Sequence, residues 1–287
     1  MFASNHLNRL SLLQIDFNIW SGQAKLNNNN EKQNGFTHKG LIKLINPLHL
    51  RPFNRLKTKA RRLCLAHGMP FLSGFAIPLE RVDIVISELE IIDKEMRKAR
   101  KDFLYRYDAY LLDWTLSNPQ YATKLKSIAL PKDTVREKLG FNYQIFKISP
   151  FNKDQEDKIN KKASNLGQSL INEIIEESKQ FFIKNLEDKI CCQINTKKTL
   201  KKLRNKVDGL IFLDDRLISV IKLLDSALHD YEHVSSSLTG EPLKTVIRAI
   251  QILSSEETII EFDETHNDDS SSYVPGYADA EQRVMHH

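Results

Sequence analysis

The sequence predicts an α+β fold that is predominantly α-helical, with a long antiparallel, coiled-coil-like pair of helices and a small antiparallel β-sheet at one end. Three observations predict it. Glycine and proline supply only 19 of the 287 residues, about half of their average usage. Apolar residues recur at spacings of three and four over long stretches, which places them on one face of a helix. Three short segments instead alternate apolar and polar residues, as strands with one buried face do.

The two longest helical patterns cover residues 79–116 and 154–191. Pro78 precedes the first pattern and Pro119 follows it, as expected for a residue that cannot continue a helix. At 1.5 Å per residue the first helix would be about 55 Å long. We expect two rods of matching length to pack as an antiparallel pair. Shorter patterns near residues 200–207, 217–231 and 243–253 are expected to complete the helical bundle.

The strands are predicted near residues 12–20, 71–77 and 141–148. Since an isolated hairpin is marginal in water, we expect the three to form one small antiparallel sheet that caps the bundle. Residues 1–254 would then form a single elongated domain. Residues 255–287 combine low hydrophobicity with like charges, and we expect this tail to be disordered.

Charge divides the chain into a basic body and an acidic tail. Residues 1–248 contain 41 Lys and Arg against 28 Asp and Glu, whereas residues 249–287 contain nine acids and one Arg. The near-neutral total of +5 therefore conceals two oppositely charged parts. Such a split indicates charged macromolecular partners or self-masking.

Two segments concentrate the basic charge. Residues 32–78 hold nine Lys and Arg and residues 189–207 hold seven, with no acid in either segment. A helical wheel of residues 47–67 separates an apolar side from a basic side. The candidate residues for binding a nucleic acid or an acidic partner are Arg51, Arg55, Lys59 and Arg62 in the first segment and Lys198, Lys201, Lys202 and Arg204 in the second.

Three interpretations of these basic faces stay open: an ordinary solvated surface, a phosphate-binding surface, or a surface that docks an acidic protein segment. No aromatic side chain accompanies the cations, which disfavours base stacking on a single strand. The acidic tail itself is one candidate ligand, with Ile259, Ile260 and Phe262 as the residues that would dock. On this hypothesis the tail screens the basic body until a partner removes it.

No catalytic residue, cofactor motif or metal site is predicted. His229 and His233 fit the H-x-x-E-H zinc pattern, but few residues follow to supply a third ligand, and we interpret the two as an ordinary helix end. The segment from Gly35 to Gly40 lacks the Lys and Ser/Thr of a phosphate-binding loop. Three cysteines, two of them adjacent, suit a reducing compartment. With no apolar run of membrane-spanning length, the expectation is a cytoplasmic protein.

Six segments stand out in order along residues 10–232: residues 14–22, Pro52 and Phe53, residues 62–68, residues 71–78, residues 103–107 with Trp114, and residues 141–148. Together they resemble an uncharacterised bacterial family that is classed as a domain of unknown function. The family recurs in phages and integrative elements, often encoded beside a MoxR-type AAA+ ATPase and a von Willebrand A domain protein. The resemblance implies an accessory or adaptor role and transfers no functional residue.

Three functional hypotheses follow. The first, which we favour, is a non-catalytic adaptor of a phage or mobile genetic element that docks with the AAA+ ATPase or the von Willebrand A protein. The second is a DNA-binding accessory protein that uses its basic helix faces. The third is a metallo-hydrolase, which depends on His229 and His233 alone. The sequence does not determine the oligomeric state.

Overall fold

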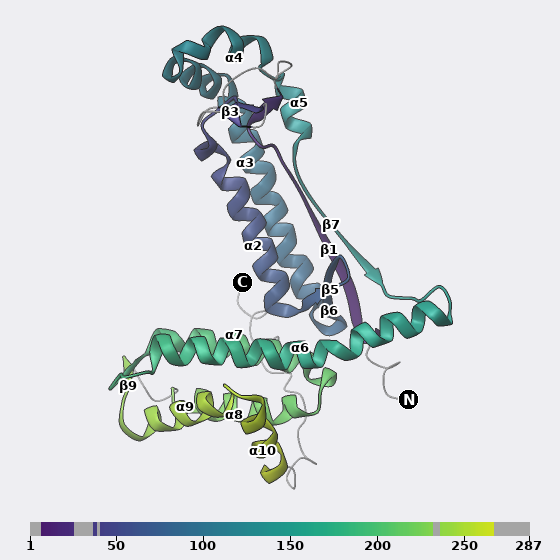
Figure 1. Cartoon of the computed structure of the whole chain (residues 1–287), viewed down its shortest axis with the longest axis vertical. Coiled ribbons are helices and arrows are strands. Elements are labelled where there is room, and N and C mark those ends of the chain that lie inside the picture. Colours follow the sequence, from purple (N-terminus) through teal and green to yellow (C-terminus); the bar gives the residue numbers. More distant parts are fainter. Residues whose placement is uncertain (1–6, 26–36, 39–40, 232–235, 267–287) are drawn as a thin grey trace, which may run out of the picture.

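An upright arm and a transverse helical base make up the molecule (Figure 1). The structure is a computed structural model, and it describes residues 7–25, 37–38, 41–231 and 236–266. The arm contains the main sheet and the helices that lie between its strands in the sequence. The base contains the helices that come after the last strand of that sheet. The apolar core is divided in the same way, into one cluster within the arm and another centred on the base.

The arm is built on a four-stranded antiparallel sheet in the order β5-β6-β1-β7. Its strands are β1 (Leu10–Ile19), β5 (Met69–Phe71), β6 (Gly74–Pro78) and β7 (Leu139–Lys147). β1 pairs with β6 at Leu13 and Phe75, and with β7 along nine residues that end at Ile19 and Leu139. The three predicted strands are therefore confirmed, and residues 71–77 prove to be part of a hairpin.

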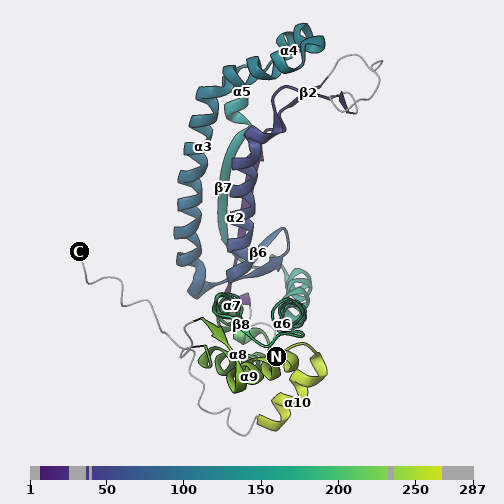
Figure 2. The ribbon, with the colours of Figure 1, turned by 90° about the vertical axis from the view of Figure 1, so that its left-hand side faces the viewer.

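Two helices cover this sheet. α2 (Arg51–His67) contacts β1 and β6, and α3 (Val82–Ser117) contacts α2 and β7 (Figure 2). Aromatic side chains fill the space between them, with the rings of Phe53 and Phe103 edge to face at 5.6 Å. The predicted apolar stripe of α3 is confirmed, since all its members line or flank this arm core.

Two hydrogen bonds to backbone carbonyls help to hold the tip of the arm on α3. Trp114 donates from Nε1 to the Lys43 carbonyl at 2.9 Å, and the Tyr107 hydroxyl donates to the Leu130 carbonyl at 2.9 Å. The elements of the tip are β2 (Gln23–Lys25), β3 (Thr37–His38), β4 (Leu41–Lys43), α4 (Ala122–Ile128) and α5 (Lys132–Glu137).

The base consists of helices whose apolar stripes face one another. Its elements are α6 (Lys153–Asn185), β8 (Cys192–Gln193), α7 (Lys197–Leu210), α8 (Arg216–His229), β9 (Ser237–Leu238), α9 (Gly240–Ile252) and α10 (Glu256–His266). Helix α8 is central, because α7, α9 and α10 all contact it. Leu217, Ile221 and Leu224 on α8 are fully buried.

The predicted antiparallel pairing of the two long helices is wrong. α6 lies across the lower end of the arm and not alongside α3 (Figure 1). The physical reason is that their stripes belong to different cores: Leu89 and Phe103 of α3 lie in the arm core, whereas Leu170 and Ile174 of α6 lie in the base core. The sheet also differs from the prediction, since it runs along the arm instead of capping a bundle.

Two further boundaries differ from the sequence prediction. α6 ends at Asn185 and not near residue 191, because the chain turns sharply through Asp188, whose φ is 54°. Ile190, which lies within the helix predicted for residues 154–191, is consequently 90% exposed. Residues 256–266, expected within the disordered tail, form α10, because Ile259 is buried against the base core. Residues 267–287 lie outside the described residues.

Candidate docking surfaces

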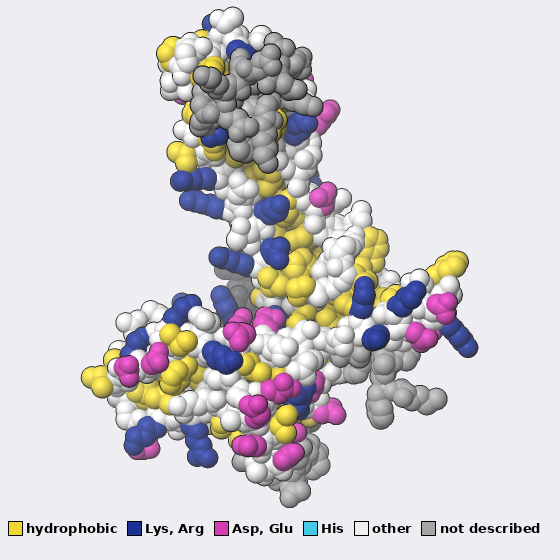
Figure 3. Space-filling model, viewed as in Figure 1, with side chains coloured by type: hydrophobic (Ala, Val, Ile, Leu, Met, Phe, Trp, Pro, Cys, Tyr) yellow, Lys and Arg dark blue, Asp and Glu magenta, His cyan; other side chains and the backbone are white. Residues whose placement is uncertain are grey.

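The basic face of α2 forms as the helical wheel predicts. Phe53, Leu56 and Ala60 are buried against the arm core, which fixes the orientation of the helix. The four predicted cations, Arg51, Arg55, Lys59 and Arg62, are all exposed on the outer side. Together with Asn54 and Thr58 they line one shallow depression, and no carboxylate contributes to that lining. Figure 3 shows cationic side chains along this edge of the arm.

One acid reaches this surface from the neighbouring helix. Lys59 Nζ lies 2.9 Å from Oε1 of Glu95 on α3, with both side chains close to half exposed. An exposed pair of this kind contributes little to stability and is screened by salt. Of the described ion pairs, this is the one that involves the row Arg51, Arg55, Lys59 and Arg62.

Only some cations of the second basic segment, on α7, are available to bind an external ligand. Lys198, Lys201 and Lys202 are exposed, as predicted. Arg204 instead binds Asp225 on α8 through two hydrogen bonds of 2.9 and 3.2 Å, and lies 3.5 Å from Asp208. The expectation that Arg204 offers its charge to an external ligand is therefore not met, because the fold already neutralises it.

Lys206, one of the seven cations counted in the second basic segment, is buried and does not contribute to a basic face, contrary to the sequence prediction. Lys206 is only 5% exposed and binds Glu173 on α6. Burial and the charge of Glu173 raise the pKa of the nearby Glu177, and the Lys206 ammonium partly opposes this shift. Its position between Leu203 and Val207 on the apolar stripe was the available signal, because a lysine there must enter the interior with a partner.

The start of the predicted tail packs on its own base. Ile259 of α10 is fully buried, Phe262 packs against the same core, and Ile260 remains 37% exposed. The three predicted docking residues therefore divide into two that contact the body and one that faces outward. The contacts of α10 are with α8, α6 and α9, not with the basic face of α2.

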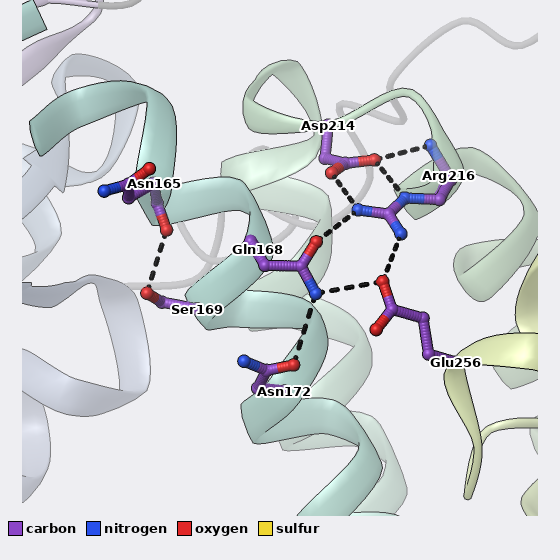
Figure 4. Close-up of polar contacts among 7 residues, drawn as sticks. All are labelled: Asn165, Gln168, Ser169, Asn172, Asp214, Arg216 and Glu256. Atoms are coloured by element: carbon purple, nitrogen blue, oxygen red, sulfur yellow. Dashed lines mark hydrogen bonds and ion pairs between the residues drawn. The ribbon is translucent and has the colours of Figure 1, made fainter. Parts of the chain in front are cut away.

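A polar cluster around Arg216 fastens α10 to the base (Figure 4). The Arg216 guanidinium donates to Asp214 at 2.7 and 2.9 Å and to Glu256 of α10 at 2.8 Å. It also donates to Oε1 of Gln168 on α6 at 2.8 Å, and Gln168 Nε2 donates to Glu256 at 3.0 Å. Side chains from three separate segments of the chain, at Gln168, at Asp214 and Arg216, and at Glu256, thus meet in one cluster.

The cluster changes the pKa of both carboxyl groups. Burial alone raises the pKa of Asp214, but the hydrogen bonds and charge of Arg216 outweigh it, so the pKa lies below its ordinary value. Hydrogen bonds from Arg216 and then Gln168 lower the pKa of Glu256. The Asp214 carboxylate also accepts the backbone N–H of Arg216 at the start of α8.

Comparison with protein families identifies the chain. The family described as "Protein of unknown function (DUF3150)" matches residues 7–255. The chain belongs to the DUF3150 family. No curated protein and no solved structure matches it. The DUF3150 match ends at the residue before α10, so the acidic helix and its contact with Arg216 lie outside the family segment.

Among the described residues of this DUF3150 protein, no group of three His, Cys, Asp or Glu side chains is placed to hold a metal ion. His229 ends α8, whereas His233 lies outside the described residues.

Cys64 is buried, and burial raises its pKa to about 12. Cys192 is buried 3.2 Å from the Tyr231 hydroxyl, and Cys191 is exposed. In the described part of the chain, no helix is both long and apolar enough to cross a membrane.

Proposed function

We propose that this DUF3150 protein is a non-catalytic accessory protein that acts in the cytoplasm by docking an acidic surface of a partner protein onto the basic face of α2. The observation that carries the proposal is the row Arg51, Arg55, Lys59 and Arg62, exposed on a helix whose other side is locked into the arm core. The eleven rises of 1.5 Å between Arg51 and Arg62 make the row about 16 Å long.

A rigid row of cations favours docking because the helix is already ordered before the partner arrives. The apolar anchors of α2 are independent of its charges, so a partner does not need to fold the surface it binds. Charge complementarity of this kind accelerates encounter and selects partners by the sign of their surface.

The family resemblance supplies the candidate partners. We propose that the protein belongs to a phage or another mobile genetic element, and that it docks with a MoxR-type AAA+ ATPase or a von Willebrand A domain protein encoded beside it. The test is to measure binding of each purified partner to the full chain and to the triple variant Arg51→Glu, Arg55→Glu and Arg62→Glu.

The triple variant should weaken binding by at least about tenfold, because each substitution places a like charge against the acidic partner. Glutamates in place of the exposed Lys153, Lys158 and Lys162 on α6 make the same change in net charge and serve as the control. The proposal fails if both triple variants weaken binding equally, or if neither candidate partner binds the wild-type chain.

The second candidate function is binding to the phosphate backbone of double-stranded DNA. The observation that favours it is the depression lined by Arg51, Arg55, Lys59 and Arg62 with neutral Asn54 and Thr58, since phosphates are held by closely spaced cations. Affinity for a duplex should then fall steeply with salt, with a slope reduced by about 0.9 for each phosphate contact removed. Duplex affinity that stays the same in the α2 triple variant contradicts this function.

A further inference from the structure

The face of α3 that is turned away from the arm core carries large apolar side chains. Ile84 and Ile91 are 46% and 45% exposed, Leu112 is 56% exposed, Leu116 is 69% exposed, and Tyr105 is 87% exposed. Figure 2 shows α3 along one edge of the arm, with α2 and β7 on its inner side. These side chains are separate from the α2 row and from the α10 contact.

The exposed side chains follow the repeat of a coiled-coil seam. Ten exposed positions alternate in steps of four and three residues along five heptads: Ile84, Glu88, Ile91, Glu95, Lys98, Asp102, Tyr105, Ala109, Leu112 and Leu116. A repeat of 3.5 residues keeps one stripe facing a second helix over many turns. Apolar residues predominate at both ends of this seam, where Glu88 is the one charged position, and charged residues occupy its middle.

We propose that α3 is the self-association surface of the protein, and that two copies pair through this seam in antiparallel orientation. Around a twofold axis at its centre, Ile84 lies opposite the partner's Leu116 and Ile91 opposite the partner's Ala109. Lys98 then lies opposite the partner's Asp102, and symmetry forms this ion pair twice.

The order of charges selects this arrangement over a parallel pair. In a parallel pair in register each residue meets its own copy, so Lys98 would face lysine and Asp102 would face aspartate. Like charges in the seam are destabilising, whereas the antiparallel register converts the same two residues into complementary pairs. Glu95, which pairs with Lys59 of its own chain, lies opposite the partner's Tyr105, whose hydroxyl can donate to a remaining lone pair of the carboxylate.

Sedimentation equilibrium of the full chain over a wide concentration range tests the proposal. A reversible monomer–dimer equilibrium is expected, and Ile91→Glu should shift it to monomer. Ile183→Glu is the matched control, because Ile183 is 55% exposed on α6, away from the seam. A wild-type chain that stays monomeric at every concentration, or equal effects of the two isoleucine variants, overturns the proposal.

A charge swap tests the pairing itself. Lys98→Asp should raise the dimer dissociation constant about tenfold or more, since it sets two aspartates opposite each other at both symmetric positions. Adding Asp102→Lys should restore dimerisation close to wild type, because the double variant re-creates both ion pairs with reversed polarity. A double variant as weak as Lys98→Asp alone overturns the antiparallel register.

Distance measurement distinguishes the two orientations directly. A spin label at Ser87→Cys, on a chain whose exposed Cys191 is replaced by Ser, reports the separation between the two copies. At 1.5 Å per residue the antiparallel dimer places the labelled backbones about 40 Å apart along the seam, whereas a parallel dimer brings them within about 10 Å. The shorter distance overturns the proposal.

Discussion

Arg81, at the start of α3, donates a hydrogen bond from Nη2 to Oδ2 of Asp208 on α7 at 3.2 Å, and so connects the arm to the base. The Asp208 side chain is only 8% exposed and is shared with Arg204. Residue 209 is glycine, and an added Cβ would lie 3.3 Å from Nε of Arg81, so a larger residue would crowd this side chain. The contribution of this contact between arm and base can be tested by substitution of Arg81.

Replacing Arg81 by alanine should lower the free energy of unfolding by about 1–3 kcal/mol, because it leaves a largely buried carboxylate with one partner fewer. Urea denaturation measures the change. Arg97→Ala is the control, since the Arg97 side chain is 71% exposed in its pair with Asp93 and should change stability by about 0.5 kcal/mol or less. Equal effects of the two variants would mean that the junction contact contributes no more than a surface pair.

The docking of α10 depends on one isoleucine more than on its neighbour. Ile259→Ala should destabilise the attachment of α10 by about 2–5 kcal/mol, because a fully buried side chain is truncated. Ile260→Ala, at a position that is 37% exposed, should have a much smaller effect. Hydrogen exchange of residues 256–266 reads out the attachment, and faster exchange in both variants alike would contradict the observed orientation of the helix.

Acid should release α10. The folded-state pKa values of Asp214 and Glu256 lie below their ordinary values of 3.8 and 4.5, so their contribution to stability is present above those values. It is lost as the pH falls further, through the lower folded-state values. Protection factors of the α10 amides, which correct for the intrinsic pH dependence of exchange, should therefore fall below about pH 4.5, with a smaller pH dependence in Glu256→Gln. An unchanged pH profile in that variant would rule out the Arg216 cluster as the cause.

Gly167 permits close contact between α6 and the segment before α8. A Cβ at this position would lie 2.5 Å from the Leu213 carbonyl oxygen, so Gly167→Ala should destabilise the base by about 1–3 kcal/mol. Gly140→Ala is the matched control, because a Cβ there meets no atom within 4 Å. Thermal unfolding compares the two variants, and a stable Gly167→Ala protein would contradict the packing of α6 against residue 213.

Local patterns predicted much of the fold. The apolar spacing placed α2 and α3, and the alternation placed β1 and β7, because each element buries one face of its own. The partners of those faces could not be predicted. Two stripes of equal length indicated one helical pair, yet Leu89 and Leu170 face different cores, which no local spacing reveals.

The same distinction between local features and long-range contacts applies to the candidate surfaces. The exposure of Arg51, Arg55, Lys59 and Arg62 was predictable because a helix fixes which side chains share a face. The neutralisation of Arg204 by Asp225 and the cluster of Arg216 with Glu256 were not predictable, because each joins residues at least twenty positions apart. The turn at Asp188, just after the end of α6, was also not predictable, because no glycine or proline marks it in the sequence.

The central position of β1 in the arm sheet determines when each part of the molecule can form during synthesis. β1 has to wait for β7, more than a hundred residues later, before its second edge is paired, so the arm completes only after Lys147 has left the ribosome. The contacts that α7, α9 and α10 make with α8 join neighbouring stretches of chain. We therefore expect the nascent arm to expose an unpaired strand edge for most of its synthesis, and the helices of the base to assemble quickly once they emerge.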